Sequence, residues 1–396
     1  MKLGILISHP IQYLVPFFRV LAKTPGLDIV VFYTWNFGVE KTMDPEFGKE
    51  IKWDIPLLEG YRSIFLSNFS PKPSSGFWGQ INPGIIPALR REKCDALLLY
   101  GWNSFTNWLA FAACILLKIR IFLRGESPWN QEIKKTAWKR SIKRILLWPL
   151  FSFTTAFLYI GEQNKEFYLR YGVPVEKLVW VPYAVDNERL MSAASELIPR
   201  RLELRRKLLD INDDGPIILF SGKFIHKKRP LNLLHAFEKV SARLKKNGMS
   251  AHLVFVGDGV LRQEIEEQIK KREILNVHLV GFQNQTQLPA FYAMADLFIL
   301  PSGEGETWGL VVNEAMCFSL PIIVSDSVGC GKDLVREGGD GFVVPLDGID
   351  ALAAQMEKVL KNVSIRKNFG EESFKIIQPY SFKVGAEKIK QLLTKV

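Results

Sequence analysis

Short apolar runs rich in branched residues alternate with longer amphipathic stretches, and this alternation limits the possible folds more than any other feature of the chain. The first series of runs covers residues 3–8, 29–34, 96–100, 119–124 and 156–160. The second series covers residues 217–221, 252–257, 277–281, 297–301 and 322–325. Runs that are apolar on both faces are typical of strands in a parallel sheet, and the stretches between them have helical spacing. The pattern predicts an α/β protein with two doubly wound domains.

The two series also indicate where the domains meet. A length of 396 residues fits two to three domains at roughly 150 residues each. The chain turns polar and charged over residues 187–206, so we place a first domain at residues 1–190 and a second at residues 191–380. Residues 381–396 have apolar positions at helical spacing and predict a last helix. The period alone does not say which domain this helix joins.

The composition limits which kinds of partner and which cellular compartment we expect for the protein. A hydrophobic fraction of 47% and a charged fraction of 23% are enough for full cores and exclude a disordered chain. The net charge of +11 favours anionic partners such as phosphate esters or an anionic membrane face. The four cysteines form no C-x-x-C pair, which favours a reducing compartment over a disulfide scaffold or a structural zinc site. The apolar run at the start is too short for a signal peptide, so we expect a cytoplasmic protein.

Much of the positive charge lies just before the most apolar stretch. Residues 118–144 hold nine Lys or Arg against two Glu. Residues 145–160 contain Pro149 and are shorter than the ~20 residues that a membrane span requires, so we expect no span there. The cationic positions alternate with apolar ones around Trp138 and are Lys134, Lys135, Lys139, Arg140, Lys143 and Arg144.

A helix over this segment has one cationic and one apolar side, and two interpretations remain open. In the first it is a surface helix whose apolar side packs on its own sheet. In the second it docks on an anionic membrane, such as the inner face of the plasma membrane. Trp138 is expected to be exposed only in the second.

The strongest candidate site follows the strand predicted at residues 297–301. A glycine-rich acidic loop comes next, and a helix is predicted to begin near Gly309. In a doubly wound sheet such a loop lies at the carboxyl ends of the strands, where ligands bind. Amides at a helix start favour a phosphate group. Glu306 lies on the loop and Glu314 within the helix, so both carboxylates can bind sugar hydroxyls at one site.

A basic segment after the first strand of the second series complements this loop. Gly222 lets a ligand approach the backbone, and Lys223 and Lys228 can neutralise a leaving diphosphate. Residues 256–259, Val-Gly-Asp-Gly, repeat the strand-to-glycine turn more weakly. Basic residues after a strand are often surface residues that bind no ligand. This segment is therefore a weak indication of a site by itself and a stronger one together with the acidic loop.

Together these motifs resemble the donor-binding half of family four of the retaining glycosyltransferases, also described as glycosyl transferases group 1. The resemblance covers about residues 215–345 and rests on Gly222-Lys223, Lys228, residues 256–259, residues 295–302, the Glu306 and Glu314 pair, and residues 320–326. The amino-terminal half resembles the family more faintly, through residues 171–173 and 181–187.

The resemblance implies a GT-B fold, in which two Rossmann-like domains face each other across a cleft. It also implies transfer of a sugar from a nucleotide-sugar to an acceptor hydroxyl with retention, with no cofactor and no metal. By the same resemblance Lys223 and Lys228 hold the diphosphate, Glu306 faces the donor sugar, and Glu314 binds the ribose. The amides that contact sugar and phosphate are those of Thr307, Trp308, Gly309 and Leu310. The nucleobase stacks near Phe282, and the last helix crosses back to the first domain.

The chain departs from the family pattern at three points. Lys223 stands where the family commonly has Arg, which loses bidentate geometry but keeps the charge. The family's amino-domain His is absent from residues 123–127, and we take Glu126 as the candidate replacement. The first loop has Ser8-His9-Pro10 in place of a glycine pair, so His9 is either a site residue or a structural histidine.

The acceptor is not readable from the sequence, although the basic helix favours a glycan or lipid-linked acceptor and hence cell-surface polysaccharide or glycolipid synthesis. One alternative is a GT-B nucleotide-sugar epimerase. Another is a non-catalytic protein that binds nucleotide-sugar or membrane. Nucleic acid is not expected as a partner, because the basic residues lack interleaved aromatic motifs and cluster on one helix.

Overall fold

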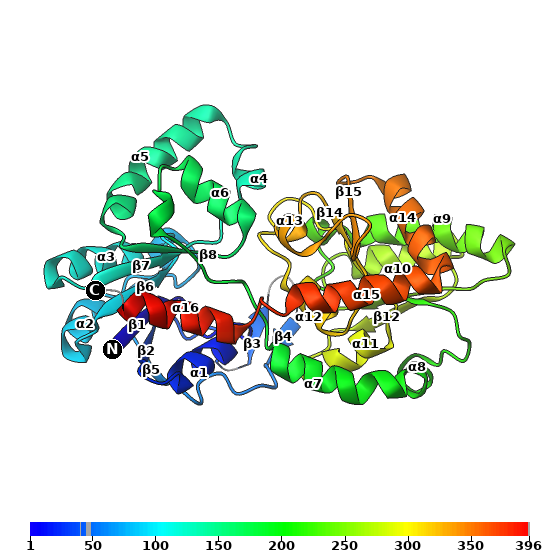
Figure 1. The fold of residues 1–396 in the computed structure, drawn as a ribbon, viewed down its shortest axis with the longest axis horizontal. Helices are drawn as coiled ribbons and strands as arrows, with labels where there is room; N and C mark the ends of the chain where they lie inside the picture. The colour runs from blue at the N-terminus through cyan, green and yellow to red at the C-terminus, as the bar shows by residue number, and fades with distance from the viewer. Residues whose placement is uncertain (40, 45–48, 395–396) are drawn as a thin grey trace. The chain divides into compact units, whose positions relative to one another are not determined.

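A computed structural model describes residues 1–39, 41–44 and 49–394, and the chain divides into two compact units. Unit 1 comprises Met1–Thr42, Ile51–Tyr183 and the residues from Ser381 onward, and unit 2 comprises Ala184–Tyr380 with the described part of Met43–Glu50. The division after Tyr183 lies seven residues before the predicted position at residue 190. Figure 1 shows a doubly wound α/β arrangement in each unit.

Unit 1 is built on a seven-stranded parallel sheet with the strand order β5-β2-β1-β6-β7-β8-β9. The strands are β1 (Lys2–Ile7), β2 (Asp28–Tyr33), β5 (Arg62–Phe65), β6 (Ala96–Tyr100), β7 (Arg120–Arg124), β8 (Ala156–Tyr159) and β9 (Leu178–Trp180). β1 pairs with both β2 and β6, so the chain fills the sheet in one direction and then in the other. The edge strand β5 was not among the predicted strands, because two of its four residues are half-buried and the other two are exposed.

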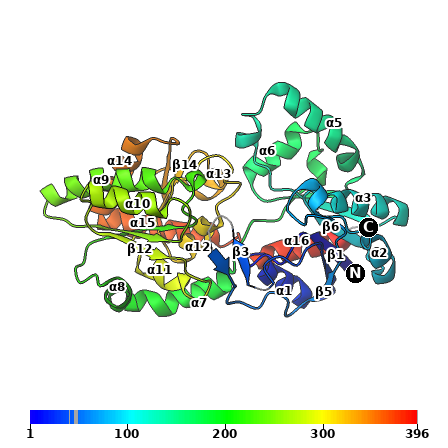
Figure 2. The same ribbon diagram turned by 180° about the vertical axis from the view of Figure 1, so that it is seen from behind.

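Helices cover both faces of this sheet. One face carries α2 (Ile85–Glu92), α3 (Phe105–Leu117), α5 (Ala137–Phe153) and α6 (Glu162–Arg170), with the short α4 (Trp129–Glu132) between α3 and α5 in the chain. On the other face α1 (Val15–Lys23) lies beside α16 (Phe382–Thr394), and the rings of Phe17 and Phe382 are 5.5 Å apart. Figures 1 and 2 both show the last helix lying along α1, so the last helix packs on unit 1.

Unit 2 repeats the plan with six parallel strands in the order β12-β11-β10-β13-β14-β15. The strands are β10 (Ile217–Ser221), β11 (His252–Val256), β12 (Val277–Gly281), β13 (Leu297–Leu300), β14 (Ile322–Ser325) and β15 (Gly341–Val344). The helices are α7 (Asn187–Leu197), α8 (Arg201–Leu209), α9 (Pro230–Lys246), α10 (Arg262–Lys271), α11 (Leu288–Met294), α12 (Leu310–Cys317), α13 (Gly331–Leu334), α14 (Ile349–Lys361) and α15 (Val363–Ile377). A separate two-stranded sheet joins β3 (Thr42–Asp44) and β4 (Lys49–Ile51).

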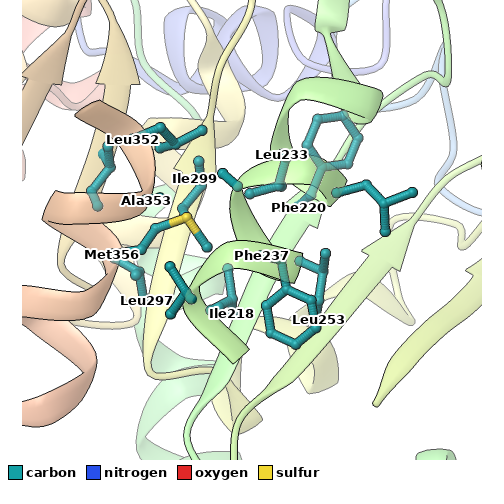
Figure 3. Close-up of a cluster of buried hydrophobic side chains, with 14 of the residues drawn as sticks. Ile218, Phe220, Leu233, Phe237, Leu253, Leu297, Ile299, Leu352, Ala353 and Met356 are labelled. Carbon is teal, nitrogen blue, oxygen red and sulfur yellow. The ribbon is translucent and has the colours of Figure 1, made fainter. Parts of the chain in front are cut away.

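The main core of unit 2 lies between the sheet and the pair α9 and α14. Figure 3 shows Phe237 on α9 and Met356 on α14 directed at the strand residues Ile218 and Leu297, and all four side chains are fully buried. Burying such side chains contributes about 2 kcal/mol each, so this layer holds the strands rigidly beneath the loops at their carboxyl ends.

The polar stretch at the predicted domain boundary, residues 187–206, is helical in the structure. α7 begins at Asn187, capped by the Asp186 side chain, and α8 follows it. Arg205 on α8 is buried and donates to both the Met294 carbonyl and the Asp296 carboxylate. The charge in this stretch therefore anchors two helices to unit 2.

Candidate active site

Unit 2 carries its candidate site where the strand order reverses. β10 lies between β11 and β13, and all three strands run in the same direction. The loops after β10 and β13 therefore leave the sheet side by side, at the point where doubly wound sheets bind ligands. The loop after β10 holds the predicted basic residues, and the loop after β13 holds the predicted acidic ones.

The first link between these loops is an ion pair. Lys228 lies in the 3₁₀ helix His226–Lys228 and bonds through Nζ to Oε2 of Glu306. Both side chains are largely buried, with exposed fractions of 14% for Lys228 and 11% for Glu306. Gly222 lies beside this pair, because a methyl group added to it would be 3.8 Å from Cε of Lys228. Three predicted site residues are thus brought together.

The glycine turn after β11 supports the loop that follows β10. Gly257 has φ +141°, and a Cβ there would lie 1.8 Å from the carbonyl oxygen of Gly222. Phe224 then accepts from Leu261 and donates to the Asp258 carbonyl at 2.8 Å. Only glycine permits so close a backbone approach. The Val-Gly-Asp-Gly motif therefore positions the neighbouring loop by backbone packing.

The acidic loop ends in a turn that aims the start of α12. Gly309 has φ +102°, and the helix begins at Leu310, one residue after the position predicted for the helix start. The first amides of a helix have no partner within it, which makes this end suited to an anion. Thr307 to Leu310, whose amides are the predicted donors, form this turn and the first residue of the helix. The Trp308 side chain is only 2% exposed and donates from Nε1 to Asn313 at 2.8 Å, so it holds the turn from inside.

Glu314, on the second turn of α12, is held from two other elements. Tyr292 on α11 donates from its hydroxyl to Oε2 of Glu314 at 2.7 Å. Ser221, the last residue of β10, bonds to the same tyrosine. Burial raises the pKa of Glu314, and the positive charge of Arg189 on α7 acts in the opposite direction. Tyr292 and Arg189 were not predicted as site residues, since nothing in their sequence context distinguishes them from core and surface positions.

The structure places the two remaining predicted donor residues at the same edge of the sheet. Lys223 follows Gly222 directly, and Phe282 follows the last residue of β12. Since β12 is two strands away from β10, Phe282 lies about 10 Å along the edge, at the usual strand spacing. That separation suits the two ends of a nucleoside diphosphate.

His9, in unit 1, follows β1 at its carboxyl end. Its Nδ1 is 2.9 Å from the Ser8 hydroxyl, and its ring meets Trp35 and Phe37 edge to face. Burial lowers the pKa of His9 to about 4, so the ring is neutral at neutral pH. A neutral imidazole that bonds a hydroxyl at a strand end fits a site role, although the aromatic contacts alone fit a structural one.

Glu126 lies among tyrosines and an arginine at the carboxyl ends of three strands of unit 1, β6, β7 and β9. Tyr183 donates to its Oε2 at 3.1 Å, and Nε of Arg124 is 3.8 Å from its Oε1. The Arg124 guanidinium in turn stacks over Tyr100 and Tyr183, at 5.7 and 5.1 Å from the ring centroids. Burial raises the pKa of Glu126. Of this cluster, only Glu126 was predicted as a site residue.

In residues 1–39, 41–44 and 49–394, no group of three or more His, Cys, Asp or Glu side chains is arranged to hold a metal ion. Within the same ranges, no helix is long and apolar enough to span a bilayer.

The chain is similar in sequence to known glycosyltransferases. Residues 203–376 match the family described as "Glycosyl transferases group 1". An α-1,3-galactosyltransferase from Escherichia coli, which uses UDP-Gal and α-D-GlcNAc-diphosphoundecaprenol, is 26% identical over 77% of this chain and 76% of its own. An α-1,4-N-acetyl-D-galactosaminyltransferase from Campylobacter jejuni, which acts on a PP-undecaprenol-linked glycan, is 28% identical over 71% of this chain and 69% of its own. The Streptomyces kanamyceticus α-D-kanosaminyltransferase is 28% identical over only about half of each chain.

Solved structures extend the similarity over the whole chain. A glycosyltransferase from Rickettsia africae superposes with a TM-score of 0.74 at 16% identity, covering 100% of this chain and 99% of that one. The Anabaena protein HepE, in complex with UDP and glucose, superposes with a TM-score of 0.71 at 16% identity, covering 100% of both chains. At such identities the similarity establishes the fold.

The two doubly wound units have the GT-B fold of these structures. The family that the motifs of unit 2 resemble, the group 1 glycosyltransferases, is the one whose model matches residues 203–376.

Proposed function

We propose that the protein transfers a glycosyl group from a nucleotide-sugar to an acceptor hydroxyl, with retention at the anomeric carbon and without a metal. The Lys228 and Glu306 pair beside Gly222 is the observation that carries this proposal, because it places a cation and an acid at the switch point of a nucleotide-binding type of sheet. Without a ligand the two groups neutralise each other. A bound diphosphate would supply Lys228 with a stronger partner and leave the acid for sugar hydroxyls.

In this proposal unit 2 stabilises the departing diphosphate. Lys223 and Lys228 supply positive charge, and the first amides of α12 supply donors that are fixed before the reaction begins. Charge grows on the leaving oxygen in the transition state, so such preorganised donors lower the barrier most. The acceptor hydroxyl attacks on the same face of the sugar, and its proton passes to the departing phosphate. This step consumes one nucleotide-sugar and releases one nucleoside diphosphate.

Glu314 is proposed to hold the ribose. Its Oε2 already accepts from Tyr292, which fixes the direction in which Oε1 faces. An anchored carboxylate accepts hydrogen bonds from a vicinal diol at little cost in conformational entropy. Phe282, two strands away, is proposed to stack on the base.

The residues of unit 1 are proposed to act on the acceptor side. The neutral ring of His9 can accept a proton or a hydrogen bond. Burial raises the pKa of Glu126 toward neutral pH, which suits a group that exchanges protons. The printed names of the E. coli and C. jejuni relatives include acceptors linked to undecaprenol through diphosphate. We therefore propose a lipid-linked glycan acceptor, in the synthesis of a cell-surface polysaccharide or glycolipid at the cytoplasmic side of the membrane.

A thermal-shift screen of nucleotide-sugars tests the donor half first, since a ligand that binds the native state stabilises it by mass action. UDP-sugars head the panel because the HepE structure holds UDP. The stabilising donor is then incubated with lipid-linked acceptors, in buffer with and without EDTA. The anomeric configuration of the product is read by NMR.

The outcomes separate the proposal from its rivals. Glycosylated product with the donor's anomeric configuration, unaffected by EDTA, is expected. Consumption of the donor with no glycosylated product would identify an epimerase or hydrolase. Binding with no turnover across the acceptor panel would identify a non-catalytic binder, and an inverted product would refute retention.

A further inference from the structure

Helix α5 of unit 1 turns one apolar side inward and another outward. Leu147, Leu150 and Phe151 are buried in the core of the unit. The outward side exposes Trp138 (61%), Ile142 (48%), Ile145 (72%) and Leu146 (62%). At 100° per residue these four positions fall within an arc of about 100°. The inward apolar residues already account for packing on the sheet, so the outward ones require another explanation.

The exposed face is a continuous surface on the outside of unit 1. Figures 1 and 2 show α5 as an outer helix of this unit, away from the helix pair α1 and α16. Trp148 (68%) and Phe153 (58%) extend the exposed apolar surface along the helix. Scattered exposed apolar residues are ordinary, but a contiguous patch with two tryptophans marks an interaction site.

The structure divides the six cationic residues of this segment into two kinds. Lys143 is partly buried and forms a 2.9 Å ion pair with the buried Glu132, and it lies over the ring of Phe167 at 4.7 Å. Burial lowers the pKa of Lys143 despite this ion pair. Lys135 pairs with the same carboxylate at 3.0 Å, and Arg140 donates to the carbonyls of Ile133 and Lys135. Lys143 and Arg140 thus tie α5 to α4 and to the turn between them, and Lys135 pairs from within that turn.

The other three cations are exposed and border the apolar face. They are Lys134, Lys139 and Arg144. Lys139 lies 5.5 Å from the ring of Trp138, so charge and aromatic surface adjoin. Cations beside an exposed face of tryptophan and aliphatic residues complement a surface that is anionic outside and apolar beneath.

We propose that this face of α5 docks on an anionic phospholipid bilayer. Trp138, Ile142, Ile145 and Leu146 enter the boundary between headgroups and acyl chains, and Lys134, Lys139 and Arg144 contact lipid phosphates. The charge favours this occupant over a second copy of the chain, because two copies meeting through this face would bring like charges together. The docking does not depend on the proposed transfer reaction.

Co-sedimentation of the full chain with vesicles tests the proposal. Binding is expected to vesicles of phosphatidylcholine with 30% phosphatidylglycerol at 0.1 M NaCl. Binding should be far weaker to pure phosphatidylcholine, and it should weaken at 0.5 M NaCl because salt screens the phosphates. Binding to both vesicle types with no effect of salt would overturn the electrostatic part of the proposal.

Two sets of variants assign the binding to this face. The triple variant Lys134→Gln, Lys139→Gln, Arg144→Gln should lose about a hundredfold in affinity, at roughly fivefold for each charge removed. Its matched control removes three exposed lysines of unit 2, through Lys245→Gln, Lys246→Gln and Lys270→Gln.

The apolar variant Ile145→Ser should lose about tenfold. Its control, Val175→Ser, changes a residue of unit 1 that is 65% exposed. Equal binding of each variant and its control would overturn the assignment.

A fluorescent label reports insertion directly. All four native cysteines are buried, so Ile142→Cys offers the accessible thiol for an environment-sensitive dye, and Val175→Cys is the control position. A blue shift with anionic vesicles at residue 142 but not at residue 175 is expected. A blue shift at residue 142 without vesicles, together with a dimer in analytical ultracentrifugation that Ile145→Ser dissociates, would assign the face to a second copy instead.

Discussion

Lys228 and Glu306 form an ion pair whose role is either structural or catalytic. Replacing the two residues singly and together distinguishes these roles. Each side chain is mostly buried, so either single change leaves an unpaired charge in a poorly solvated place. Breaking a fully buried pair costs about 3–5 kcal/mol of unfolding free energy. With the residual exposure here, we expect about 2 kcal/mol for Lys228→Met and a similar cost for Glu306→Gln.

The double variant Lys228→Met with Glu306→Gln leaves no charge unpaired. Its unfolding free energy in urea should return to within about 1 kcal/mol of the native value, because the removed pair had cancelled most of its own desolvation cost. Activity should behave differently. Each single variant should lose at least about a hundredfold in kcat/KM, or roughly 3 kcal/mol, and the double variant should not recover.

The assay measures nucleoside diphosphate release and urea unfolding on the same four full-length proteins. Arg243→Ala is the control. It breaks a 3.0 Å ion pair between Arg243 on α9 and Glu357 on α14, and the Arg243 side chain is 46% exposed. It should cost less than about 1 kcal/mol and leave activity unchanged. If the double variant regained activity together with stability, the pair would be only structural, and the catalytic reasoning would be refuted.

Three further changes test single features of unit 2. Tyr292→Phe removes the hydroxyl that orients a glutamate of α12, so the donor KM should rise about tenfold with a smaller change in kcat, and an unchanged KM would contradict the ribose assignment. Burial raises the pKa of Asp340 from 3.8 to about 6, so its stability contribution is present below pH 3.8 and is lost as pH rises through 6. Asp340→Asn should therefore raise the unfolding free energy by about 2 kcal/mol at pH 8 and by progressively less toward pH 4, and a gain independent of pH would rule out titration. Gly257→Ala would drive a methyl group into a neighbouring carbonyl and should cost more than about 3 kcal/mol, whereas Gly84→Ala, with nothing within 4 Å, should be close to neutral in thermal denaturation.

The strand pattern predicted most of the fold, because strands buried on both faces are apolar throughout. β1, β2, β6 to β8 and β10 to β14 all coincide with predicted runs to within about two residues. The edge strand β5 and the last strand, β15, were missed. β5, Arg-Ser-Ile-Phe, has only two apolar residues and no buried one. β15, Gly341–Val344, has three apolar residues after a glycine-rich stretch, so neither strand shows the continuous apolar run of a central strand.

The candidate site was predicted in part. Lys228 and Glu306 lie in loops after strands, and Glu314 lies within the helix that follows the second loop, and that order along the chain is visible in the sequence. Tyr292 and Arg189 were missed, since they reach Glu314 from α11 and α7 and only the packing of these helices brings them there. Trp308 was predicted as a site residue because of its backbone amide. The burial of its ring is seen only in the structure of the turn.

The α5 segment was likewise predicted only in part from the sequence. The sequence established that Trp138 shares a helix with six cations, but it left two arrangements open. Helical periodicity places residues on faces, and it does not say which of two apolar faces meets the core.

What the sequence by itself determined is therefore the order of strands, helices and charged loops, because local spacing encodes secondary structure and the sites at strand ends. Only the tertiary structure decided which apolar face of α5 is buried, which cations are tied to Glu132, and which side chains surround Glu314. These depend on contacts between segments far apart in the chain, where packing and desolvation choose among arrangements that local patterns leave equally open.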